Sequence, residues 1–139
     1  MLVELELAEE ANIVANIAAK PNATDDLMSV LTSLVRQVLA AEQRLGPVVF
    51  RGMLGLHFSA TRPVDDGPTE HPLAQFVITA IANAQAAGRA SRDGDAGELG
   101  VIFLTGLFAL LATATTASAP RAALLDQYVK TIVKGMQAP

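Results

Sequence analysis

The clearest pattern of apolar and polar positions lies between residues 27 and 39. Apolar side chains recur there at spacings of three and four residues, at Leu27, Val30, Leu31, Leu34, Val35, Val38 and Leu39. This spacing places them on one face of an α-helix. Asn22 or Thr24 is expected to cap this helix, with Asp26 in its first turn. Gly46 is expected to end it, because glycine commonly terminates helices.

Weaker patterns and helix-breaking residues predict five more helices and no strand. Their expected positions are residues 2–20, 47–57, 70–88, 95–119 and 120–136. Asp95 followed by Glu98 has the form of a capping box, which predicts a well-defined helix start there. The segment "TRPVDDGPTEHP" is rich in proline, glycine and aspartate, so it is expected to be a surface loop. The chain is therefore predicted to be an all-α, six-helix protein.

The segment from Leu99 to Ala119 contains no charged residue and must be kept from water in some way. Its length is barely that of a membrane span, which needs about 20 apolar residues. Its second half, "ATATTASA", gives little transfer free energy into lipid, and no Trp or Tyr lies at either end. We expect burial against protein and no membrane contact, and a small membrane protein is the less favoured alternative.

A second copy of the chain would cover this helix. Small residues on one side of it allow another backbone to approach closely, and the last helix carries apolar residues on one side. The predicted interface comprises Gly106, Ala109, Thr113, Ala117, Leu125, Tyr128 and Ile132. This arrangement predicts a homodimer, in which residues 95–136 of both chains form a four-helix bundle with a symmetric interface.

The composition fits one domain that spans residues 1–139. The chain has 10 Lys and Arg against 14 Asp and Glu, a formal net charge of -4, and no cluster of basic residues. Such a surface does not attract phosphates, so no nucleic-acid contact by this chain itself is expected. It has no cysteine and no signal of basic residues before an apolar core, which favours a cytoplasmic protein.

Few residues carry chemistry. His57 and Ser59 are two positions apart on a predicted helix and so do not face each other, and there is no glycine-rich phosphate loop. We therefore expect no enzyme activity and no cofactor. The acidic and histidine side chains of residues 57–71 lack a recognised ligand spacing, and no metal site is expected: His57, Asp65, Asp66, Glu70 and His71.

Two stretches together resemble a known family. They are "GPVVFRGMLGL" (46–56) and "HPLAQFVITAIANAQAAGRASRDGDAGELGVIFLTGLFALLATATTASAPRAALLDQYVKTIVKGM" (71–136). Their order of elements resembles the C-terminal ligand-binding and dimerisation domain of TetR-type transcriptional regulators. The resemblance implies that residues 1–20 form the connecting helix and that the family's helix-turn-helix head is absent from this chain.

The resemblance also implies a function. The chain would be the effector-sensing and homodimerisation domain of a transcriptional repressor, and would contact DNA only through the missing head. A small, largely apolar effector would enter between the middle helices, and the expected pocket residues are Phe50, Met53, Leu54, His57, Phe76, Thr79 and Asn83. The alternative is a headless interaction protein that forms heterodimers with full-length regulators.

Overall fold

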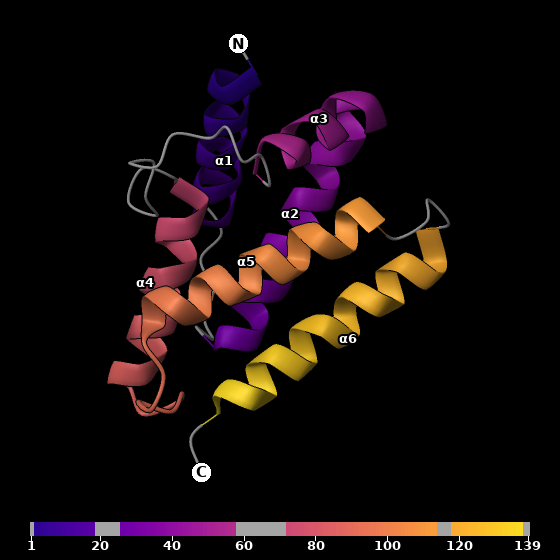
Figure 1. The fold of residues 1–139 in the computed structure, drawn as a ribbon. Helices are drawn as coiled ribbons and strands as arrows, with labels where there is room; N and C mark the ends of the chain where they lie inside the picture. Colours follow the sequence, from indigo (N-terminus) through magenta and orange to yellow (C-terminus); the bar gives the residue numbers. More distant parts are fainter. Residues whose placement is uncertain (1, 19–25, 58–71, 114–117, 138–139) are drawn as a thin grey trace.

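Helices make up nearly all of the described structure, a computed structural model that covers residues 2–18, 26–57, 72–113 and 118–137. Six helices occur there, which confirms the predicted all-α class (Figure 1). They are α1 (Leu2–Ala18), α2 (Leu27–Leu45), α3 (Pro47–His57), α4 (Pro72–Ala86), α5 (Ala96–Thr113) and α6 (Ser118–Met136). The described residues form no strand, only an isolated bridge between Ala90 and Gln137.

Aspartates cap the starts of α2 and α5. The Asp26 carboxylate accepts a hydrogen bond from the Ser29 backbone N–H at 2.6 Å, and this bond holds the pKa of Asp26 below its ordinary value. Asp26 is thus the cap of α2, where a residue of the first turn was expected. Asp95 accepts from the Glu98 N–H at 3.0 Å, as the capping-box pattern predicted. The expected caps of α2, Asn22 and Thr24, lie outside the described residues.

Glycines end α2 and α4 as predicted. Gly46 (φ 84°) follows α2, and Gly88 (φ 77°) follows α4. The Gly88 N–H bonds to the Gln85 carbonyl, and the Arg89 N–H bonds to the Ala84 carbonyl. This pair of bonds is a Schellman motif, which needs a left-handed residue at the position of Gly88. The two sequence-based helix ends are therefore confirmed.

The uncharged segment belongs to two helices in the described residues. α5 is described from Ala96 to Thr113, and α6 begins at Ser118, two residues before Pro120. Residues 114–117 lie outside the described residues, so the expected extent of a helix to Ala119 stays a prediction. Within the described residues, no helix is long and apolar enough to cross a membrane.

One apolar core joins the helices. α1 packs against α2, α3 and α4, while α5 packs on α4 and α6 packs on α2 and α5 (Figure 1). The largest fully buried side chains come from α2, α4, α5 and α6: Phe103, Leu31, Leu34, Ile81, Leu107, Leu125 and Val77. The buried positions of α2 include most of the predicted stripe, so its apolar periodicity identified the core face correctly.

Two adjacent carboxylates attach α1 to its neighbours. Glu9 forms an ion pair with Arg44 in the last turn of α2, at 3.0 Å. Glu10 accepts a hydrogen bond from the Leu73 backbone N–H at 3.1 Å. Leu73 lies in the first turn of α4, where backbone N–H groups have no helical partner and a negative charge is favourable. Adjacent residues of α1 are therefore bonded to both α2 and α4.

Candidate functional site

The aromatic residues of the predicted pocket lie at the core. Phe50 on α3 is buried, and Phe76 on α4 is half-buried and packs against the same apolar cluster. Met53 is half-buried. Leu54 and His57 belong to α3, but their side chains lie outside the described residues. Phe50 and Phe76 therefore both belong to the single apolar core of the described residues.

The predicted polar contacts from α4 have a different position. Thr79 and Asn83 are exposed on α4. The Thr79 hydroxyl accepts a hydrogen bond from the Gln75 side-chain amide at 3.3 Å, one helical turn away. These two side chains thus lie at the surface of the single chain, away from the buried positions of α4. Whether they contact an effector stays a prediction.

Gly106 on α5 makes its close contact within the chain. Tyr128 on α6 stacks on Phe103 with 5.6 Å between ring centroids, and its hydroxyl donates to the Phe103 carbonyl at 2.7 Å. A Cβ atom at residue 106 would lie 2.9 Å from Tyr128 Cζ, closer than real Cβ contacts. The missing side chain of Gly106 therefore leaves the space that the Tyr128 ring fills.

The Tyr128 hydroxyl predicts a loss of stability at alkaline pH. Burial raises its pKa from 10.0 to about 12. The unfolded chain loses this proton first, so the stabilisation is complete below pH 10 and is lost as the pH rises toward 12. We expect the free energy of unfolding, measured by urea denaturation, to fall across this range. The Tyr128→Phe variant has no hydroxyl, so its free energy of unfolding should fall less over the same pH range. An identical pH profile in the wild-type protein and the variant would contradict this assignment.

An exposed surface with few charges lies along the last two helices, and the exposed Glu98 lies at one end of it, one helical turn before Ile102. We call it the α5–α6 face; its exposed members are Val101, Ile102, Thr105 and Ala112 on α5 and Leu124, Gln127, Thr131 and Gly135 on α6. Ile102 is 55% exposed on a helix that carries no charge after Glu98. The exposed charges of α6 recur at a spacing of four, Asp126, Lys130 and Lys134, and Lys134 lies one turn after Thr131 at the edge of the face.

The predicted interface residues divide between this face and the interior. Ala109, Tyr128 and Ile132 are half-buried beside the face. Leu125 is only 1% exposed and packs inside the single chain, so it has almost no surface left for a partner. The side chains of Thr113 and Ala117 lie outside the described residues. Sequence periodicity missed Val101, Ile102 and Leu124, although their spacing relative to the buried Phe103 and Leu107 was the available signal.

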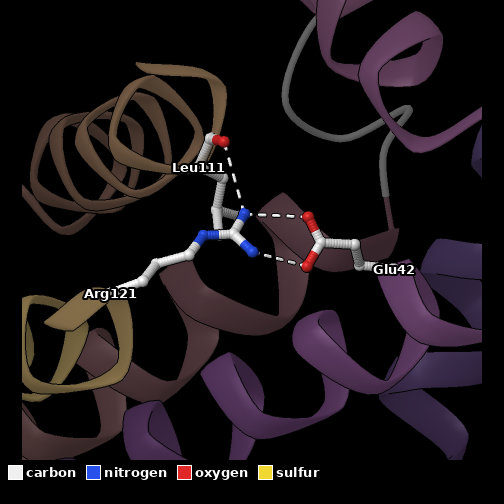
Figure 2. A network of polar contacts seen from close by, with 3 residues as sticks. All are labelled: Glu42, Leu111 and Arg121. Carbon is white, nitrogen blue, oxygen red and sulfur yellow. Dashed lines mark hydrogen bonds and ion pairs between the residues drawn. The ribbon is translucent and has the colours of Figure 1, made fainter. Parts of the chain in front are cut away.

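A polar contact joins three helices near the α5–α6 connection (Figure 2). Arg121 on α6 forms a two-bond ion pair with Glu42 on α2, at 2.6 and 2.8 Å. The same guanidinium donates to the Leu111 carbonyl at the end of α5, at 3.3 Å. Both charged side chains are mostly buried, with 12% and 18% exposed. A planar guanidinium suits this geometry, because it offers parallel donors to a carboxylate.

The described residues contain no group of three or more side chains that could hold a metal ion. The histidines and acidic residues of the segment 57–71 lie outside the described side chains, so the expectation for them is untested. The ion pair between Arg121 and Glu42 uses both carboxylate oxygens and leaves no free base there. The described residues therefore form a packed helical protein in which the α5–α6 face is exposed.

Comparisons with known proteins identify no relative of this chain. No family model, curated protein or solved structure matches it. The interpretation of the α5–α6 face and of Phe50 and Phe76 therefore depends on the residues themselves.

Proposed function

We propose that this chain is the effector-sensing and homodimerisation domain of a TetR-type transcriptional repressor. Its own contribution is to pair with a second copy through α5 and α6 and to respond to a small, largely apolar molecule. DNA would be contacted only by a helix-turn-helix head that this sequence does not contain.

The α5–α6 face carries this proposal. Its exposed apolar side chains lie along two adjacent helices, and the nearest charges, Glu98 and Lys134, lie at its edges. A water-exposed strip of this kind is favourable to cover, because each Å² of apolar surface removed from water contributes about 25 cal/mol. Two copies related by a twofold axis would place the same strip against itself, which suits a surface with few charges.

The effector part of the proposal depends on Phe50 and Phe76. Phe50 and Phe76 come from two of the middle helices and contribute to the core beside α1. An apolar molecule that entered there would compete with core side chains, and so would shift the balance between two packings of α1. The family resemblance assigns this region to effector binding, and the aromatic residues suit an apolar effector.

The proposal is tested by the mass of the protein in solution. We expect light scattering to give twice the 14.5 kDa of one chain. Ile102→Arg adds a charge at the centre of the α5–α6 face and should give a monomer, because a buried unpaired charge is strongly unfavourable. Ile102 is exposed within one chain, so the variant should fold.

Val48→Arg is the control variant. Val48 on α3 is 83% exposed and is not part of the α5–α6 face, so this change should leave the dimer intact. Gly106→Arg would not be informative, because residue 106 contacts Tyr128 of its own chain. A monomeric wild-type protein, or a dimeric Ile102→Arg variant with an unchanged helical spectrum, would contradict the proposal.

A further inference from the structure

A groove of about 430 Å³ lies between α2 and α6. This volume lies within the range of small-molecule sites, roughly 300–1,000 Å³. Its lining comes from five residues of α2 and three of α6, including Arg36, Leu39, Ala40, Gln43, Ala122 and Leu125. The groove shares no residue with the predicted effector pocket or with the α5–α6 face.

Small side chains explain the open space. Ala40 and Ala122 are exposed on the two helices and fill little volume between them. Leu39 and Leu125 provide an apolar floor, with Leu125 buried. The lower side chains of this groove are therefore apolar, and its rim is polar.

The two ends of the groove differ in charge. Glu42 and Arg121 lie at one end, where their ion pair balances both charges. Arg36 lies six residues earlier on α2, about 9 Å along the helix axis at 1.5 Å per residue. Arg36 is exposed and forms no ion pair with any residue that the structure describes. The groove therefore has one uncompensated positive charge, at its Arg36 end.

We infer that this groove binds a small amphipathic carboxylate, with its acid group at Arg36 and its hydrocarbon chain over Ala40 and Ala122. The guanidinium supplies charge and parallel donors for the acid. The opposite orientation would place the acid at the Glu42–Arg121 end, where the positive charge is already paired. The Gln43 amide adds an uncharged polar group at the rim. This inference does not depend on the chain being a regulator.

Decanoate and decanol, which differ in their head group, test the inference. Titration calorimetry below the micelle concentration gives the affinity of each compound. The ratio of the two affinities cancels the contribution of the hydrocarbon chain that both compounds have. We expect Arg36→Gln to reduce the decanoate-to-decanol affinity ratio about threefold to fivefold, the usual value of a partly exposed ion pair. Arg51→Gln is the matched control, because Arg51 is exposed on α3, and it should leave the ratio unchanged.

The position of the site has its own readout. Decanoate should shift the backbone amide NMR signals of residues 39–43 and 122–125 in the wild-type protein. Ala40→Trp should abolish binding of both compounds while the helical spectrum is kept, because residue 40 is exposed and the larger side chain fills the groove. Shifts centred on α3 and α4, no binding, or an unchanged affinity ratio in Arg36→Gln would overturn the inference. The solution mass tests the proposed dimer separately.

Discussion

Replacing Phe103 with alanine is expected to lower the free energy of unfolding by about 4 kcal/mol. Phe103 is one of the largest fully buried side chains and lies at the centre of α5. The variant would lose the buried ring and would leave a cavity that its neighbours can fill only partly. It would also remove the ring on which Tyr128 stacks. Urea denaturation at one fixed protein concentration measures the change.

Val48→Ala provides the comparison for this core variant. It also shortens an apolar side chain in a helix, but residue 48 is 83% exposed. We expect a change within about 0.5 kcal/mol, as for most surface substitutions. Similar losses in Phe103→Ala and Val48→Ala would show that α5 does not pack on the core as described.

Replacing Glu42 with alanine is expected to lower the free energy of unfolding by about 3 kcal/mol. The change leaves the Arg121 guanidinium mostly buried without a negative partner, and an uncompensated buried charge is strongly destabilising. Removing both charges together, in Glu42→Leu with Arg121→Met, should restore stability to near the wild-type value, because the two apolar side chains avoid the desolvation cost. Thermal and urea unfolding of the single and double variants measure this difference.

The ion pair between Arg44 and Glu9 provides a matched control for this measurement. Glu9→Ala leaves Arg44 behind, which is 46% exposed, so solvent screens the remaining charge and the free energy of unfolding should fall by less than about 1 kcal/mol. An equal loss in Glu9→Ala and Glu42→Ala would mean that burial of the remaining charge does not set the strength of the Arg121 contact. A double variant as unstable as Glu42→Ala would contradict the explanation by unpaired charge.

Local rules predicted much of the helical framework. Gly46, Gly88 and Asp95 define helix boundaries through backbone geometry and hydrogen bonds to near neighbours, so their effects could be derived from short stretches of sequence. The apolar stripe of α2 identified its buried face for the same reason, since helical spacing alone determines which side chains share a face.

Contacts between distant residues could not be derived in this way. Periodicity placed Leu125 on an apolar face, but did not show that the same chain covers it. Gly106 was expected to meet a second copy, whereas Tyr128 of its own chain lies against it. Arg121 and Glu42 are 79 residues apart, and only the packing of α6 on α2 brings them together. Which of the predicted site residues contact a partner or an effector therefore stays a prediction, because such contacts depend on how distant residues pack.

The neighbouring glutamates of α1 connect that helix to two different helices. Glu9 is tied to α2 and Glu10 to α4, from successive positions of one helical turn. A rotation of α1 about its axis would therefore displace both attachments together, and a separation of α2 from α4 would turn the helix. Motion between these two helices would thus be passed along α1 toward Leu2, at its amino-terminal end.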